Sequence, residues 1–266
     1  MSNTIISFAA IACYLATATL LAMRLTKKIG IENKTRLILL GLAAVALHAT
    51  VLAFNMLTPQ GINFGFFNAV SLLSWLIALI LLTAALTKPV ENLGIVLLPL
   101  AALAISLELL FPSEYYILEA GKTQIGAHIL ISIIAYSLLS IAAMQAILLA
   151  IQDRHLHNKH PGGFIRTLPP LQTMETLLFQ MIGLGFIFYS LSLATGVLFI
   201  ENMFAQHLAH KTVFSITAWL VFAILLWGRW QYGWRGKKAI RWTLGGFSAV
   251  FLAYLGSKLV LEVVLK

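Results

Sequence analysis

Long apolar runs separated by short polar connections dominate this sequence. Eight runs each reach the length of about 20 residues that a helix needs to cross the ~30 Å hydrocarbon core of a bilayer. They cover residues 4–25, 37–56, 67–87, 93–111, 126–151, 174–199, 212–230 and 241–264. The pattern predicts an all-α fold, a polytopic integral membrane helix bundle of eight transmembrane helices. Because the connections are short, we expect residues 1–266 to form a single transmembrane domain.

Composition supports the membrane class. Hydrophobic residues make up 60% of the chain and charged residues only 10%, whereas soluble domains average about 45–50% and 25%. The single cysteine, Cys13, excludes an intramolecular disulfide, a CxxC redox pair and a cysteine-rich metal site. The motifs GxGxxG, Walker A, HExxH and GxSxG are absent from the sequence. We therefore do not expect an enzyme.

The basic residues predict how the helices are oriented. The net charge is +9, and 14 of the 18 Lys and Arg residues fall in the connections after the first, third, fifth and seventh runs. By the positive-inside rule these connections face the cytoplasm, so both termini are predicted to be periplasmic in a bacterial inner membrane. The charge excess then reflects orientation and gives no reason to expect a nucleic-acid partner. Because the basic residues follow the first run, we expect that run to be a spanning helix and not a cleavable signal peptide.

Histidines are concentrated at the predicted outer side. His48 lies within the second run, His128 opens the fifth, and His207 and His210 lie in the connection before the seventh, spaced to share a face on a helical turn. Neutral imidazole is a good axial ligand for haem iron. For His48 an interhelical hydrogen bond is an equally good interpretation, because a polar ring in hydrocarbon needs a partner. For His128 the alternative is an interfacial helix start.

Two further features interrupt the apolar runs. Glu108 lies near the outer end of the fourth run, and an ionisable residue inside a membrane is a functional candidate by default. In the sixth run Gly185, Ser192 and Gly196 fall on one helical face. Such small residues allow close approach of another helix or of a flat ligand, and helix packing is the commoner use.

The predicted cytoplasmic side carries its own pattern. Tryptophans that we interpret as an interfacial belt surround the basic connection 229–241, at Trp227, Trp230, Trp234 and Trp242. The histidines of the longest connection, residues 152–173, are expected to be solvated, namely His155, His157 and His160. Their neighbours Arg154 and Lys159 would repel a metal ion.

Two stretches resemble a known family beyond composition. Residues 126–156, which read GAHILISIIAYSLLSIAAMQAILLAIQDRHL, resemble the helix that opens with an external histidine in the CcsA-type cytochrome c assembly proteins. Residues 210–256, which begin HKTVFSITAWL, resemble the family's C-terminal part. The matching residues are His128, Tyr136, Lys211, Ser215 and Trp219. The sixth run looks like the family's helix between these stretches, and with it the resemblance extends over residues 126–256, about half the chain. The layout of eight spans is most similar to the small YpjD/HemX-like branch.

The resemblance implies a membrane protein that binds or handles haem at the periplasmic side, in support of cytochrome biogenesis. His128 and His210 are the preferred ligand pair, because both lie in the resembling stretches. His48 is a further candidate, and Lys211 is a candidate partner for a haem propionate. No other metal is expected. The partners implied are the lipid bilayer, haem and cytochrome biogenesis proteins.

One departure limits what the resemblance implies. Haem-delivery members of the family carry a tryptophan-rich outer loop that ends in WDPKE, whereas this chain reads FIENMFAQHLAHKTVFS there. Lys211 remains, but the tryptophans and the aspartate do not. We therefore do not expect haem-lyase activity. Two other functions stay open. One is a transporter of a metal ion or small solute, motivated by the polar residues inside the runs, namely His48, Glu108, Lys258 and Glu262. The other is a non-catalytic regulatory scaffold.

Overall fold

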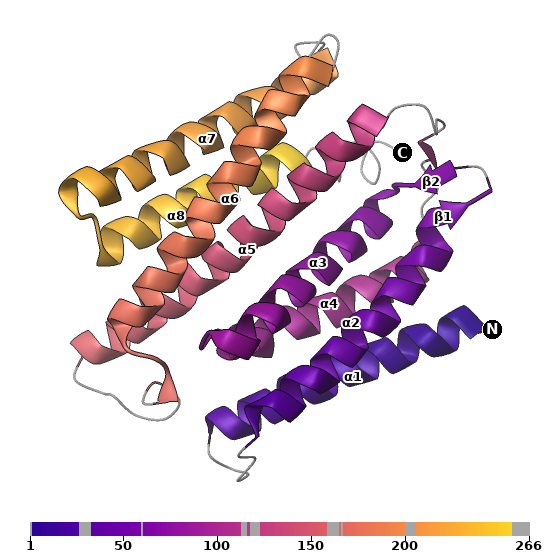
Figure 1. Ribbon diagram of the computed structural model, residues 1–266, viewed down its shortest axis with the longest axis horizontal. Coiled ribbons are helices and arrows are strands. Elements are labelled where there is room, and N and C mark those ends of the chain that lie inside the picture. The colour runs from indigo at the N-terminus through magenta and orange to yellow at the C-terminus, as the bar shows by residue number, and fades with distance from the viewer. Residues whose placement is uncertain are drawn as a thin grey trace. The chain divides into compact units, whose positions relative to one another are not determined.

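Helices form most of the chain that the computed structural model describes (Figure 1). The described residues are 2–26, 33–59, 61–112, 116–117, 123–158, 165, 167–199 and 206–256. The long helices are α1 (Ser2–Leu25), α2 (Lys34–Met56), α3 (Phe66–Thr87), α4 (Gly94–Leu110), α5 (Thr123–His157), α6 (Leu171–Phe199), α7 (Gln206–Tyr232) and α8 (Gly236–Phe251). A short 3-10 helix, η1 (Glu91–Leu93), precedes α4, and a π-helix, η3 (Leu252–Gly256), follows α8.

Seven of the described helices are long and apolar enough to cross a membrane. They are α1 to α7, and each coincides with a predicted run, which confirms the all-α membrane class. The helix α8 begins five residues before the eighth predicted run and has 16 residues. Residues 257–264 of that run lie outside the described residues, so an eighth span stays a prediction.

The helix α5 is longer than its apolar run, which ends at residue 151. Mostly polar residues 152–157 continue the helix to His157. A helix needs no apolar side chains to extend, and residues 152–160 contain no Gly or Pro that would end it. Arg154, His155 and His157 occupy the last turn, where positive charge interacts favourably with the helix dipole. The connection between the fifth and sixth runs is therefore partly helical.

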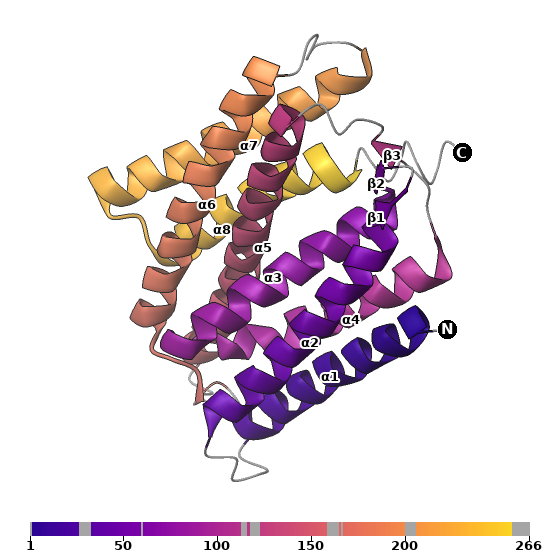
Figure 2. The same cartoon turned by 45° about the vertical axis from the view of Figure 1, so that its right-hand side comes forward.

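A small antiparallel sheet is present that the apolar pattern did not predict (Figure 2). Its strands are β1 (Leu57–Thr58), β2 (Gly61–Asn63) and β3 (Tyr116–Ile117), in that order. Gly61 has φ 123°, a conformation that glycine adopts easily, and this allows the turn between β1 and β2. The Thr58 hydroxyl donates a hydrogen bond to the Gly61 carbonyl at 2.7 Å. Strands of two or three residues are too short to show alternation in a sequence.

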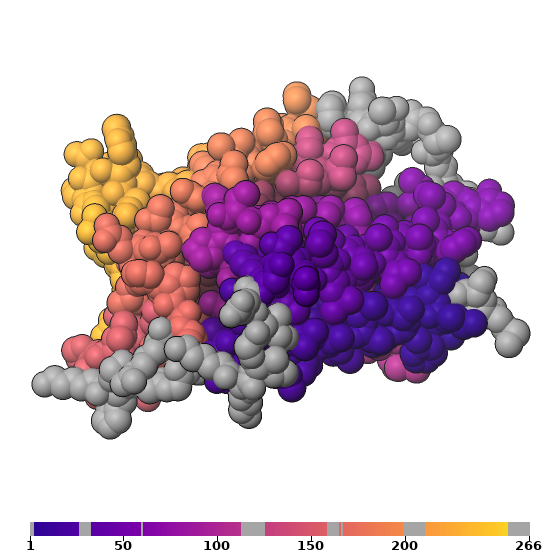
Figure 3. Space-filling model, turned by 60° about the horizontal axis from the view of Figure 1, so that its bottom comes forward, coloured from indigo at the N-terminus to yellow at the C-terminus, as the bar shows by residue number. Residues whose placement is uncertain are grey.

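The chain divides into two compact units. The first comprises Met1–Ala120 and Gly162–Leu168, and the second comprises Gly121–Pro161 and Pro169–Lys266. The single domain expected from the sequence stays a prediction. In the first unit α1 packs against α2 and α4, and α3 packs against both α2 and α4. Figure 3 shows one face of this packing, where the indigo surface of α1 continues into the violet surface of α2.

Connections of the first unit meet at two ends. At one end Glu91, after α3, lies 3.0 Å from Lys34 at the start of α2 and 3.9 Å from Arg24 at the end of α1. Thr167, from the connection after α5, donates to the Leu25 carbonyl at 3.1 Å. The sheet joins the connections after α2 and α4. Connections after α1, α3 and α5 thus meet at one end of the unit, and connections after α2 and α4 meet at the other, as expected for helices that cross a membrane in alternating directions. Which end faces the cytoplasm stays a prediction.

In the second unit α5 packs along α6 and against α8, and α7 packs against α6 and α8. The small-residue face of α6 is turned toward α5. A Cβ atom added to Gly185 would lie 2.8 Å from a methyl carbon of Leu139, which is closer than atoms normally approach. The prediction that this face serves close helix packing is therefore confirmed at Gly185.

Candidate functional site

His48 is completely buried in the first unit, with none of its surface exposed. Its Nε2 atom lies 2.9 Å from the Ser71 hydroxyl on α3. Its Nδ1 atom lies 3.3 Å from the Tyr14 hydroxyl on α1, and the two rings meet edge to face. Both ring nitrogens are thus engaged, and the imidazole joins three helices. This is the geometry of the interhelical hydrogen bond that the sequence offered as one of two interpretations.

Glu108 is the buried acid of the same unit. Its Oε1 atom accepts a hydrogen bond from the Asn55 amide at 2.7 Å, and Asn55 in turn accepts one from the Asn3 amide at 2.7 Å. The Ser71 hydroxyl also interacts with the Glu108 carboxylate, while the Oε2 atom has no well-aligned hydrogen-bond partner among the described residues. The sequence identified Glu108 and His48 but not their partners, because these lie 23 to 53 residues away along the chain.

His128 opens the polar seam between α5 and α6 in the second unit. Its Nδ1 atom lies 3.0 Å from the Thr195 hydroxyl. That hydroxyl has a single proton, which it donates to the Leu191 and Ser192 carbonyls at 2.9 and 3.0 Å. When that proton points to a carbonyl, the Thr195 oxygen is the acceptor for His128 Nδ1, and this tautomer leaves Nε2 with its lone pair.

The His128 ring also makes a hydrogen bond with the Ser192 backbone, and no contact of its Nε2 atom is found among the described residues. The ring is half-buried and lies against Gly196, where an added Cβ would be 3.2 Å from the ring carbon Cε1. One turn along, the Ser132 hydroxyl lies 2.6 Å from the Ser192 hydroxyl and also 2.6 Å from the His128 carbonyl. The seam holds the ring in one orientation with a free nitrogen, which is how a metal-ligating histidine is arranged.

His210 and Lys211 lie in the first turns of α7, also in the second unit. The sequence placed His207 and His210 in a connection, but their backbone is helical, so the two residues share a face of α7. Their side chains lie outside the described residues. Lys211 is half-buried and has an interaction of its own. Whether His210 lies beside His128 stays a prediction.

Aromatic residues from the stretches that carry the family resemblance converge in the second unit. The Tyr136 ring on α5 lies 6.1 Å from that of Tyr189 on α6 and 5.1 Å from that of Tyr254 in η3. The Tyr189 hydroxyl donates to the Ser215 carbonyl on α7 at 3.1 Å. The Trp219 indole donates to the Ser190 hydroxyl at 2.9 Å. The resembling residues thus join the helices of this unit to one another.

The described part of the chain contains no group of three or more His, Cys, Asp or Glu side chains that could hold a metal ion. Of the histidines expected to be solvated, His155 and His157 are exposed and His160 lies outside the described residues. The Nδ1 atom of His155 lies 2.8 Å from the Ile151 carbonyl of its own helix.

These features define a multi-pass membrane protein with polar side chains bonded inside its helix bundles. Comparison with known proteins identifies the family. The model of the family described as "Cytochrome C assembly protein" matches residues 37–265. The chain therefore belongs to the cytochrome c assembly protein family.

Individual relatives agree with this assignment. The chain is 32% identical to "Inner membrane protein YpjD" of Escherichia coli (strain K12), over 96% of this chain and 97% of that protein. It is 31% identical to "Cytochrome c biogenesis protein CcsA" of Chlamydomonas reinhardtii, over 51% of this chain and 38% of that protein. No solved structure matches. With its apolar helices, the chain is a multi-pass protein of the bacterial inner membrane.

Proposed function

We propose that this protein binds or handles haem at the periplasmic side of the membrane in support of cytochrome c biogenesis, and that it makes no covalent bond itself. The observation that carries the proposal is the hydrogen bond between His128 Nδ1 and the Thr195 hydroxyl, 3.0 Å long. With Nδ1 as the donor, this bond supports the tautomer in which Nε2 has the free lone pair, as an axial haem ligand requires. Family membership supports the choice of haem as the ligand.

Each residue then has a defined role. His128 presents Nε2 from the half-buried start of α5, and Thr195 holds its ring in place. His210, in the first turn of α7, is the second ligand of the proposed pair. Lys211 supplies positive charge near a haem propionate. His48 is not used, because both of its nitrogens already have partners. When bound, haem would supply an iron centre that is carried and not chemically transformed.

The test is an absorption spectrum of protein purified in detergent from cells supplied with haem. We expect a Soret band that is lost in the double variant H128A/H210A. The matched control is His155→Ala, which removes an exposed histidine from the opposite end of α5. The proposal fails if there is no Soret band, or if the double variant keeps the band of the control.

Transport of a small cation is the second candidate, and one observation favours it. Glu108 is only 4% exposed, and its Oε2 atom has no well-aligned hydrogen-bond partner among the described residues. A buried carboxylate without a counter-charge is a position for a proton or a cation. Flux measured in proteoliposomes, lost in Glu108→Gln, would support this candidate. Absence of flux for protons and divalent metals would exclude it.

A further inference from the structure

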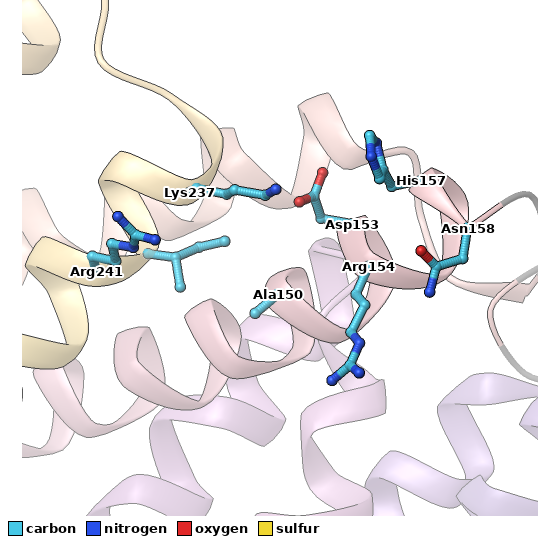
Figure 4. Close-up of a pocket in the computed structure, with 8 residues that line it drawn as sticks. Ala150, Asp153, Arg154, His157, Asn158, Lys237 and Arg241 are labelled. Carbon is cyan, nitrogen blue, oxygen red and sulfur yellow. The ribbon is translucent and has the colours of Figure 1, made fainter.

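A cavity of about 360 Å³ lies between the last turns of α5 and the first turns of α8 (Figure 4). Its lining includes Arg154 and Asp153 from α5, and Lys237 and Arg241 from α8. Three permanent cations and one carboxylate thus line the same cavity. We call this the basic cavity. Its volume is within the range of sites that bind small molecules or lipid headgroups.

Within the described part of the chain, the cations of the basic cavity, Arg154, Lys237 and Arg241, form no ion pair. Figure 4 shows that Lys237 and Asp153 point toward each other across the cavity, yet they form no ion pair. Like charges gathered around an empty space repel one another, and an anion bound between them would remove that repulsion. The charge pattern therefore selects an anionic ligand.

A neighbouring cavity differs from the basic cavity in the sign of the charges that line it. It has a volume of about 450 Å³ and shares Asp153 and Ile240 with the basic cavity. Its charged lining is Asp153, Glu175 and Arg235, so carboxylates outnumber cations. Glu175 also accepts a hydrogen bond from the Gly236 amide at the start of α8. Basic surface charge alone would not produce two adjoining cavities of opposite charge balance.

Tryptophans place the basic cavity at the level of the lipid headgroups. Trp230 is 82% exposed, and Trp234, just before α8, packs 5.4 Å from Trp242. Indole rings gather at the boundary between hydrocarbon and water, where the lipid phosphates lie. Lys238 is next to Lys237 but does not line the cavity, since its Nζ atom lies 4.0 Å from the centre of the Trp234 ring.

We propose that the basic cavity binds the phosphate group of an anionic phospholipid, held by Lys237, Arg241 and Arg154. Phosphate esters suit this site because lysine and arginine recognise phosphate oxygens with charge-assisted hydrogen bonds. The headgroup level favours a lipid over a soluble phosphate compound. This inference is independent of haem binding and concerns the opposite end of α5.

The test measures binding of phosphatidylglycerol to the purified protein by native mass spectrometry. Phosphatidylcholine and soluble glycerol phosphate are the comparison ligands. We expect wild type and the control Lys238→Ala to bind phosphatidylglycerol alike. The double variant K237A/R241A should bind about 30-fold more weakly, because each basic side chain contributes roughly five-fold near an anionic surface. Asp153→Asn removes the opposing carboxylate and should tighten binding.

Two outcomes would overturn the proposal. One is a double variant that binds phosphatidylglycerol as tightly as Lys238→Ala does. The other is glycerol phosphate binding as tightly as the lipid, which would assign the cavity to a soluble ligand. Lys237 and Arg241 are exposed and have no partner among the described residues, so their loss is not expected to unfold the protein. Thermal unfolding without lipid checks this point.

Discussion

The Thr195 hydroxyl on α6 lies within hydrogen-bond distance of Nδ1 of His128 on α5, at 3.0 Å. Two backbone carbonyls lie within 3.0 Å of the same hydroxyl and can take its only proton, which leaves the threonine oxygen to accept a hydrogen bond from Nδ1. A side chain that never touches the ligand thereby sets which nitrogen of the histidine is available. This relationship makes the haem proposal testable at a second residue.

Thr195→Val removes the acceptor while keeping the shape of the side chain. We expect haem affinity to fall by about 10- to 100-fold, the usual effect of losing a partner of a ligating histidine. Thr195→Ser keeps the acceptor and should behave like wild type. Haem titration of the purified proteins measures this difference. Equal affinities for the Val and Ser variants would contradict the role given to Thr195.

His48→Leu should destabilise the protein without affecting haem binding. The change leaves the Tyr14 and Ser71 hydroxyls without their partner in a buried environment. An unsatisfied buried polar group costs about 1–3 kcal/mol. Denaturant unfolding in detergent should show this loss, while the Soret band stays. Loss of the band in a folded variant would make His48 a ligand after all.

The α5–α6 seam predicts opposite results at two neighbouring glycines. An added Cβ at Gly185 would meet Leu139 at 2.8 Å, whereas one at Gly183 would meet nothing within 4 Å. Gly185→Ala should therefore destabilise the second unit by about 1–3 kcal/mol through overpacking. Gly183→Ala should be neutral or slightly stabilising, because alanine favours helix. Thermal melting compares them, and equal melting temperatures would refute the packing described.

Two replacements of Glu108 separate the role of its negative charge from the role of its hydrogen bond to Asn55. Glu108→Gln keeps an oxygen that accepts the bond from Asn55, so stability should change little. Glu108→Leu leaves the Asn55 amide without that acceptor and should lower the free energy of unfolding by about 1–3 kcal/mol. Chemical denaturation in detergent checks both variants. A Gln variant as unstable as the Leu variant would mean that the carboxylate charge itself is required.

Membrane orientation is testable with single cysteines in a Cys13→Ser background. Pro59 lies between α2 and α3, and His155 near the end of α5, and both are exposed. If the basic connections are cytoplasmic, a membrane-impermeant maleimide added to spheroplasts should label P59C and not H155C. The reverse labelling would invert the topology and place His128 on the cytoplasmic side.

Much of the fold was predictable because a spanning helix leaves a long apolar run in the sequence. The same reasoning identified the face of α6 that bears Gly185 and Ser192, since helical spacing alone puts these residues together. The sheet was missed because its strands contain two or three residues. The extension of α5 to His157 was missed because apolar content marks membrane crossing and not the end of a helix.

The site was predictable only in part. Burial of a polar ring in hydrocarbon already demanded a partner for His48, but periodicity does not say which helix faces which. Tyr14 and Ser71 became visible as partners only in the structure. The role of Thr195 was hidden for the same reason, since it lies 67 residues from His128 in the chain. The sequence of an apolar helix contains few signals that tell which other helix it packs against.

Titration of the haem-free protein with haem tests the central claim most directly. Wild type, His128→Ala and His155→Ala are compared in the same detergent, with the Soret absorbance followed to saturation. The account predicts that wild type and His155→Ala bind alike, and that His128→Ala loses the band or shows one of changed position and much weaker affinity. An unchanged band and affinity in His128→Ala would contradict it.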